Sequence, residues 1–160
     1  MELRKINLEN IDEVLALKVA KKQESFVAPN TASIIEAYAT ISSGYAAYPF
    51  GIYENDTPIG FVMFGYDTTE DKYEPEIAKG NYCLWRFMID EKFQHKGLGK
   101  KALELCLNYL KEYPWGKAEY CWLSYEPENE RARKLYHQAG FAENGEMCGD
   151  EIIAVLKLQA

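Results

Sequence analysis

The stretch FQHKGLGKKALELCL, residues 93–107, joins a basic, glycine-containing turn to the start of a helical pattern. Gly97 and Gly99 lie one residue apart among three lysines, in a chain whose net charge is −7. Backbone N–H groups at the start of a helix lack an internal partner, and the helix dipole adds positive potential there. Because glycines let a bulky anion approach the backbone, the stretch predicts a phosphate-binding turn. The alternative is a plain glycine turn with solvated lysines.

The segments on both sides of the turn indicate a strand–turn–helix unit. Residues 82–89, YCLWRFMI, are almost all apolar and predict a buried strand at the centre of a sheet. Residues 97–113 repeat apolar side chains at helical spacing, and Pro114 and Gly116 end the pattern. The sequence therefore predicts that the turn is held between a central strand and an amphipathic helix.

Two common phosphate-binding motifs do not fit the turn. A P-loop has a glycine and a Ser or Thr where this chain has Gln94 and Lys101. The letters GLGKKA match a dinucleotide-binding fingerprint, but in that fingerprint the glycines directly follow a strand. Too few residues follow Gly99 to complete the usual two-halved dinucleotide fold. The phosphate ligand must therefore belong to another class.

Length and composition indicate one globular domain that spans residues 1–160. Apolar residues make up 48% of the chain, which suits a packed core rather than a disordered segment. The net charge of −7 argues against nucleic-acid binding, because phosphate backbones need a basic surface. The same charge suits a small cationic substrate, although it can also serve solubility alone.

The cysteines and the hydropathy pattern predict a cytoplasmic chain without a metal site. Cys83, Cys106, Cys121 and Cys148 have no metal-site spacing, and the chain has two histidines. Free, buried thiols are typical of a reducing compartment. Residues 1–15 lack the apolar core of a signal peptide, and no apolar run approaches 18 residues, so we expect no membrane contact.

The order of predicted elements indicates an α/β fold. Helices are predicted at 8–18, 31–41, 97–113 and 127–139. Strands are predicted at 2–8, 48–56, 58–66, 82–89 and 118–125, followed by a closing hairpin of 140–147 and 150–158. In the second helix Ile34, Tyr38 and Ile41 fall on one side, and Asn7 or Asn10 could cap the first.

Two motifs resemble those of the GNAT family of N-acetyltransferases. Residues 87–103, FMIDEKFQHKGLGKKAL, resemble its acetyl-CoA-binding motif, [QR]-x-x-G-x-[GA], which Gln94 to Gly99 fill here. Residues 129–141, NERARKLYHQAGF, look like the later helix of the family, N-x-x-A-x-x-L-Y-x-x-x-G-F, at the expected distance. The stretch LSYEPENERARKLYHQAGF, together with FVAPN near the N-terminus, is similar to the bacterial spermine/spermidine acetyltransferases.

The resemblance implies a fold, a reaction and a partner. The GNAT fold is a mixed, mostly antiparallel sheet of six to seven strands, splayed at its centre and flanked by about four helices. The family moves the acetyl group of acetyl-CoA to a primary amine by direct attack, without a metal. A polyamine is the predicted acceptor, and the family's habit of dimerising predicts a homodimer. The alternatives are another amine, such as a protein N-terminus, a lysine, an aminoglycoside or an amino acid, or a non-catalytic CoA-binding domain.

The resemblance also assigns residues to acetyl-CoA. The main chain of the central strand would pair with the pantetheine arm, and the amides of the following turn would hold the pyrophosphate. Asn129 would bond the pantetheine amides, the alternative being a polar residue at a helix start. Tyr136 lies two helical turns further on and would give a proton to the leaving CoA thiolate. The predicted cofactor-binding residues are Phe87, Met88, Ile89, Gln94, His95, Lys96, Gly97, Leu98, Gly99, Lys100, Asn129 and Tyr136.

The acceptor side is less defined by the sequence. An alkylammonium, with a pKa near 10.4, must lose a proton before it attacks. Some diamine acetyltransferases carry a glutamate just before the CoA-pairing strand residues, but Trp85 and Arg86 stand there in this chain. Glu126 is therefore the predicted base, Glu24 and Glu36 the predicted partners of distal charges, and Trp85 a predicted wall of the groove. The alternative for each acid is a solvated surface side chain.

Overall fold

The structure, a computed structural model, describes residues 1–69 and 74–158 and contains a seven-stranded sheet in the order β1-β2-β3-β4-β5-β7-β6. The strands are β1 (Glu2–Lys5), β2 (Ala47–Glu54), β3 (Thr57–Tyr66), β4 (Tyr82–Ile89), β5 (Tyr120–Tyr125), β6 (Ala142–Cys148) and β7 (Glu151–Lys157). The α-helices are α1 (Ile11–Leu15), α2 (Asn30–Ser42), α3 (Leu98–Lys111) and α4 (Glu130–Gln138). Short 3-10 turns are η1 (Lys21–Gln23), η2 (Glu76–Ala78) and η3 (Glu91–Phe93).

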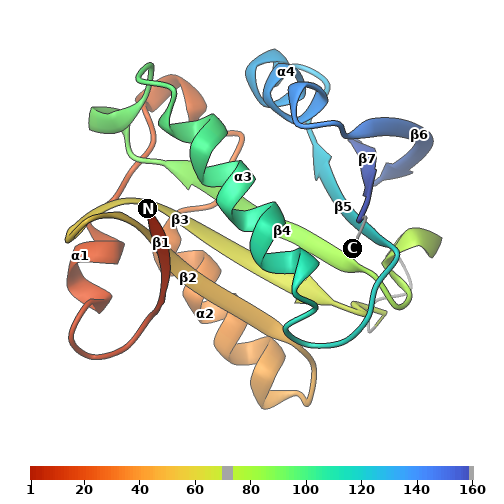
Figure 1. The fold of residues 1–160 in the computed structure, drawn as a ribbon, viewed down its shortest axis with the longest axis horizontal. Coiled ribbons are helices and arrows are strands. Elements are labelled where there is room, and N and C mark those ends of the chain that lie inside the picture. Colours follow the sequence, from red (N-terminus) through yellow and green to blue (C-terminus); the bar gives the residue numbers. More distant parts are fainter. Residues whose placement is uncertain (70–73, 159–160) are drawn as a thin grey trace.

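The sheet is mixed but mostly antiparallel, because β4 and β5 form its parallel pair. Helix α3 packs on one face, while α1 and α2 pack on the other (Figure 1). The predicted α/β fold, with six to seven strands and about four helices, is confirmed.

The centre of the sheet is splayed, as predicted. Strands β4 and β5 are paired at Tyr82 with Cys121 and at Cys83 with Trp122. Both strands continue beyond these pairs, β4 to Ile89 and β5 to Tyr125, without further pairing to each other. The gap that opens between them is the place where a ligand can reach the backbone of both strands.

A β-bulge in β4 changes which side chains face each side of the sheet. Met63 of β3 pairs with Arg86 and Phe64 with Leu84, so Trp85 has no opposite residue. An extra residue in a strand breaks the alternation of side chains between the two faces. Trp85 and Arg86 consequently both lie on the α2 face, where Trp85 packs beside α1 and α2 and Arg86 contacts Glu36.

Helix α3 has the amphipathic character predicted from its sequence. Its buried residues, Ala102, Leu103, Cys106, Leu107 and Leu110, belong to the main core between the helix and the sheet. The residue before the helix, Gly97, has a φ of 75°, a left-handed conformation that favours glycine. The core thus fixes the helix axis, while the glycine turns its first N–H groups toward the end of β4.

The first predicted helix is shorter than expected. Residues 8–18 were predicted to be helical, but α1 begins at Ile11, and Leu8 is 96% exposed. Asn10 precedes the helix without capping it: its Oδ1 accepts from the Asn7 N–H at 2.8 Å, and its Nδ2 donates to the Lys5 carbonyl at 3.0 Å. The side chain of Asn10 thus stabilises the turn that follows β1, which is incompatible with a helix beginning at residue 8.

The second helix has the predicted position, but its buried side is rotated away from most of the predicted apolar stripe. Tyr38 and Ile41 are 75% and 53% exposed, whereas Asn30, Ser33 and Ala37 are buried. Small and polar side chains fit here because the helix packs closely and Asn30 Nδ2 donates to the Val14 carbonyl at 2.9 Å. Ile34 of the predicted stripe still packs against the core beside Val14 and Ala37, so helical periodicity located the helix and indicated its buried side only in part.

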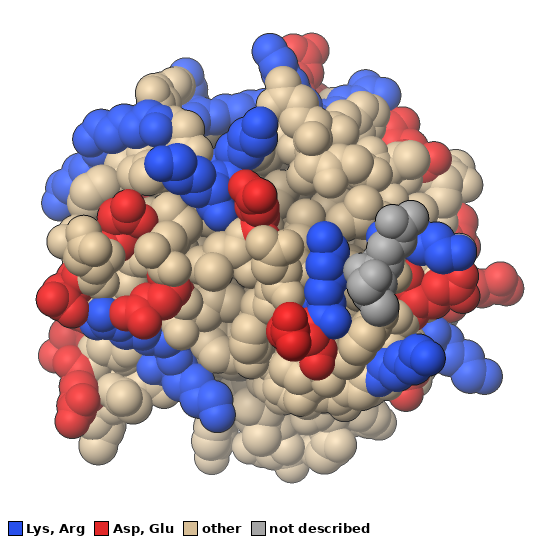
Figure 2. All heavy atoms as spheres, in the orientation of Figure 1, with Lys and Arg blue, Asp and Glu red and all other residues tan. Residues whose placement is uncertain are grey.

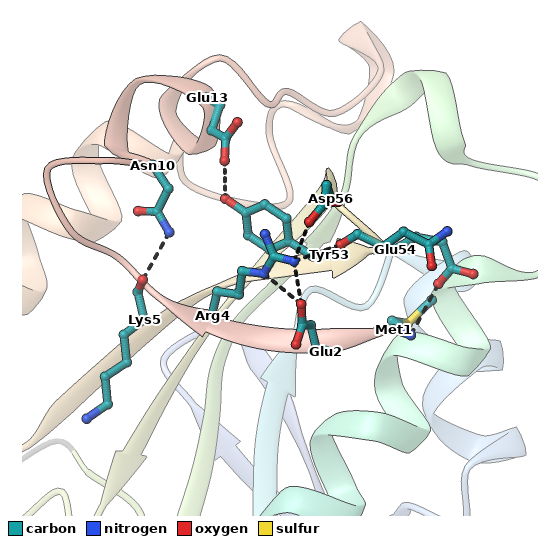
Figure 3. Close-up of polar contacts among 10 residues, drawn as sticks. Met1, Glu2, Arg4, Lys5, Asn10, Glu13, Tyr53, Glu54 and Asp56 are labelled. Carbon is teal, nitrogen blue, oxygen red and sulfur yellow. Dashed lines mark hydrogen bonds and ion pairs between the residues drawn. The ribbon is translucent and has the colours of Figure 1, made fainter.

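Polar contacts fasten the β1 edge of the sheet to α1 (Figure 3). The Arg4 guanidinium donates to Glu2 and to Asp56 Oδ1, the latter at 3.0 Å, and lies 4.3 Å from the centre of the Tyr53 ring. The buried Tyr53 hydroxyl donates to Glu13 of α1. Burial and this hydrogen bond to Glu13 raise the pKa of Tyr53 to about 12. These contacts stabilise the edge of the sheet opposite to β6.

Candidate active site

A cavity of about 450 Å³ lies at the splay between β4 and β5. Strand β4 contributes its residues from Cys83 to Ile89, and α4 contributes its inner face from Asn129 to Tyr136. The segment around η1 and the first turn of α3 close one end, and β7 reaches the other. The volume is in the range of small-molecule sites, and it joins the two motifs found in the sequence.

The turn before α3 presents a run of unpaired backbone donors. Within the described parts of the chain, none of the N–H groups from Gln94 to Lys100 has a protein acceptor. His95 and Gly97 have left-handed backbones, with φ of 62° and 75°. Such residues turn neighbouring N–H groups into one concavity, and the dipole of α3 adds positive potential there. A backbone of this shape is able to bind an anion.

Lysine side chains strengthen the positive field of the turn, although not all point outward. Lys96 Nζ donates to the Lys92 carbonyl at 2.8 Å and lies 5.5 Å from the centre of the Phe93 ring. Its charge is therefore held against the turn itself. Figure 2 shows lysine and arginine side chains gathered at the upper left of this face, where Figure 1 places the start of α3. Lys100 is exposed there.

The two glycines of the turn are needed for different reasons. Gly97 has a positive φ, so its backbone conformation favours glycine. Gly99 lies inside α3, and a Cβ added to it would meet only Ile89 Cγ1, at 3.8 Å, which is an ordinary contact. Packing within the described chain therefore does not require glycine at position 99. Because Gly99 lines the cavity, the missing side chain leaves room for a ligand.

The side chain of Gln94 joins three elements around the turn. Its Nε2 donates to Gln23 Oε1 at 2.8 Å and to the Ile89 carbonyl at 2.9 Å. Its Oε1 accepts from Arg131 Nη1 of α4 at 3.1 Å. Gln94 thus fixes the turn to η1, β4 and α4, while its backbone N–H remains available to a ligand. Arg131, which lines the cavity here, was not found from the sequence.

Asn129 caps α4 and also lines the cavity. Its Oδ1 accepts from the Ala132 N–H at 3.2 Å and caps α4. Its Nδ2 has no acceptor in residues 1–69 and 74–158, and Asn129 lines the cavity. An asparagine can donate from the amide nitrogen while its oxygen caps a helix, so the cap does not exclude ligand binding.

Tyr136 lies buried in the cavity wall. Its ring packs against Tyr125 and Phe141, each with centroids 5.9 Å away. Burial raises the pKa of Tyr136, and the negative charge of Glu151 raises it further. No residue of the described chain accepts a hydrogen bond from its hydroxyl, so a protonated donor faces the cavity.

The structure separates the residues that were predicted to contact the acceptor. Trp85 and Glu126 line the cavity, whereas Glu24 and Glu36 do not. Glu24 is exposed, and Glu36 accepts from Arg86 Nη2 at 2.8 Å. Lining residues for which the sequence predicted no role include Thr68, Glu74, Arg86, Ser124 and Glu151.

The described chain offers no activated nucleophile among its buried cysteines. Burial raises the pKa of Cys121 to about 12 and that of Cys83 well above the usual thiol value. Both side chains therefore stay protonated at neutral pH, which disfavours an acyl-enzyme route. In residues 1–69 and 74–158 no cluster of three His, Cys, Asp or Glu could hold a metal, and no helix is long and apolar enough to cross a membrane.

A sequence profile of the acetyltransferase (GNAT) family matches residues 14–141, most of the chain and both motifs. The chain belongs to the GNAT family. This membership confirms the predicted acetyltransferase class, for which acetyl-CoA is the acetyl donor. The cavity is the place in this GNAT fold where the two predicted motifs meet.

Relatives and solved structures agree with the family. The spermine/spermidine N(1)-acetyltransferase of Bacillus subtilis (strain 168) is 30% identical over 147 residues, which cover 92% of this chain and 91% of the relative. The aminoglycoside acetyltransferase AAC(6')-Ib, solved with coenzyme A, superposes with a TM-score of 0.78 at 19% identity, over 97% of this chain and 93% of that one. The PaiA N-acetyltransferase of Thermoplasma acidophilum, also with coenzyme A, gives 0.63 at 17% identity and 98% coverage of both chains. At these identities the structures show the shared GNAT fold.

Proposed function

We propose that this GNAT enzyme acetylates a primary amine of a polyamine such as spermine or spermidine. The observation that carries the proposal is the charge of the proposed acceptor end, where the carboxylates of Glu126 and Glu151 line the cavity. Of the two arginines that line the cavity, Arg131 donates to Gln94 at the turn, and Arg86 is paired with Glu36. A net negative wall attracts a polycation. The likeness to a spermine/spermidine acetyltransferase supports the same acceptor.

The other end of the cavity suits acetyl-CoA. The unpaired amides from Gln94 to Lys100 would hold the pyrophosphate. Beyond Leu84, the edge of β4 that faces β5 has no strand partner, so the main chain of Phe87 to Ile89 is available to the pantetheine amides. An extended ligand arm can pair with a free strand edge in the way that an additional strand does. Asn129 Nδ2 would add a donor from the facing helix.

Tyr136 would act as the acid of the reaction. The attacking amine displaces CoA as a thiolate, and the Tyr136 hydroxyl gives that sulfur a proton. The raised pKa of Tyr136 keeps the hydroxyl protonated at neutral pH. The same apolar surroundings also raise the pKa of the CoA thiol, so the pKa values of the phenol and the thiol stay close enough for the proton to be transferred. The roles assigned to Glu24, Glu36 and Glu126, the cytoplasmic location and the homodimer stay predictions.

An amine panel tests the proposed function. Thiol release from acetyl-CoA is measured with spermine, spermidine, kanamycin, a lysine-containing peptide and free lysine at equal concentrations. We expect kcat/KM for a polyamine to exceed that of each other amine by about tenfold or more. If another amine is acetylated and no polyamine is, the acceptor belongs to the class of that other amine. Calorimetric binding of CoA without acetylation of any amine would instead indicate a non-catalytic domain.

A further inference from the structure

A carboxylate outside both sequence motifs occupies the wall of the cavity. Glu151 is the first residue of β7, which pairs with β5 so that Tyr125 lies opposite Ile152 and Ser124 opposite Ile153. This register places Glu151 at the end of β5, where β5 has diverged from β4. The Ser124 hydroxyl donates a hydrogen bond to its carboxylate. The side chain is thus held in one position at the open end of the splay.

Glu151 also lies near the residue that faces the leaving sulfur. Its negative charge contributes to the raised pKa of Tyr136, which reaches the cavity from α4 on the other side. Because strand side chains alternate, Glu151 lies on the sheet face of Ser124 and Ile153, whereas Tyr136 packs with Tyr125 on the other face. The two side chains therefore reach the cavity from opposite sides of the splay. The other charged and titratable side chains that line the cavity are Glu74, Cys83, Arg86, Tyr125, Glu126, Arg131 and Cys148.

Two observations favour Glu151 over Glu126 as the group that meets the acceptor nitrogen. In residues 1–69 and 74–158 no donor fixes the Glu126 carboxylate, whereas Ser124 fixes that of Glu151. Strand β4 carries Trp85 and Arg86 at the bulge and no carboxylate before Phe87. The Glu151 carboxylate, which reaches the splay from β7, can therefore supply the base that the central strand β4 lacks.

We propose that Glu151, positioned by Ser124, binds the reacting ammonium of the acceptor and removes its proton. The inference rests on the proposed acetylation of an amine. Glu151 takes one proton from R–NH₃⁺, and the freed lone pair forms the C–N bond to the acetyl carbon. The C–S bond breaks, and the thiolate takes the Tyr136 proton. The second proton on nitrogen restores Tyr136, and Glu151 releases its own proton to water.

The pH profile of Glu151→Gln tests this assignment. The wild-type enzyme binds the ammonium form, so its kcat/KM should change little between pH 7 and 9.5. Glu151→Gln should need the free amine, whose fraction rises about tenfold per pH unit below a pKa near 10.4. We expect kcat/KM of the variant to be about 100-fold below that of the wild type at pH 7, and the difference should shrink about tenfold per pH unit. The KM for acetyl-CoA should not change. Asp150→Asn removes the same charge one residue away, outside the cavity, and should behave like the wild type.

Further variants separate the alternatives. Ser124→Ala keeps the Glu151 carboxylate but removes its hydrogen-bond donor, so activity should fall about five- to tenfold while the pH profile stays flat. This variant also tests the assignment if Glu151→Gln does not fold. A wild-type rate and profile in Glu151→Gln, or the steep profile in Glu126→Gln instead, would overturn the assignment. Failure of the wild-type enzyme to acetylate any amine would overturn the proposed function, whereas an active wild type with an unaltered Glu151→Gln overturns the inference alone.

Discussion

The two ends of the cavity are built in different ways. The proposed donor end uses contiguous backbone, the end of β4 with the turn from Gln94 to Lys100, and faces the start of α4. The proposed acceptor end uses side chains that lie far apart in the sequence, such as Arg86, Ser124 and Glu151. A backbone site needs local sequence to form a particular turn, whereas a side-chain site needs the correct register of several strands. The first kind can be recognised in a sequence, and the second becomes visible only in the fold.

The largest effect is expected at Tyr136, where the two ends meet. Tyr136→Phe removes the proposed proton donor but keeps the ring that packs against Tyr125 and Phe141. We expect kcat to fall by about 100- to 1,000-fold, with the KM for acetyl-CoA within about twofold of wild type. Because the pKa of Tyr136 is raised, the wild-type rate should show no loss from its ionisation up to pH 10. Steady-state kinetics would contradict the role if kcat changed less than about threefold.

Gly99→Ala should affect the donor end alone. The added methyl group has room beside Ile89, and alanine is the better helix former, so thermal unfolding should be unchanged or up to about 2 °C higher. The same methyl group would lie where the proposed phosphates approach, so the KM for acetyl-CoA should rise about tenfold while the KM for the amine stays constant. Glu104→Ala, on the exposed face of α3, should leave both KM values unchanged. A lower Tm would show that the fold, not the ligand, requires this glycine.

Much of the fold could be predicted from local patterns. The amphipathic residues of α3 and the apolar run of β4 gave the correct elements, because each buries its apolar side in the same core. The errors lie where tertiary contacts outweigh periodicity. Asn10 bonds backward to Lys5 and shortens α1, and Asn30 and Ser33 replace apolar residues on the inner side of α2. Neither contact has a signal in the spacing of apolar residues.

The candidate site could also be predicted only in part: residues in local motifs were found, and residues positioned by tertiary contacts were not. Gln94 and Gly99 of the first motif line the same cavity as Asn129 and Tyr136 of the second, because each motif follows one of the two strands that splay apart. Glu36 was expected to contact the acceptor, but the bulge at Trp85 turns Arg86 toward α2 and pairs it with Glu36. Glu151 enters through the β5–β7 register, which no local motif encodes. The closing hairpin was recognised as two strands, but the residues that it places opposite β5 could not be derived.

A smaller effect, confined to the acceptor end, is expected from Arg86→Met. The Arg86 side chain is 22% exposed, and its charge lies in the wall that the proposed polycation approaches. Its removal leaves Glu36 unpaired and the wall more negative. Removing one like charge near a protein surface should strengthen the binding of spermine by about 1 kcal/mol, so the KM for spermine should fall about fivefold. The KM for acetyl-CoA should not change, whereas Arg131→Met should raise it and leave that of spermine unaltered. A higher KM for spermine in Arg86→Met would mean that Arg86 helps to bind the acceptor, and the charge argument for a polycation would then fail.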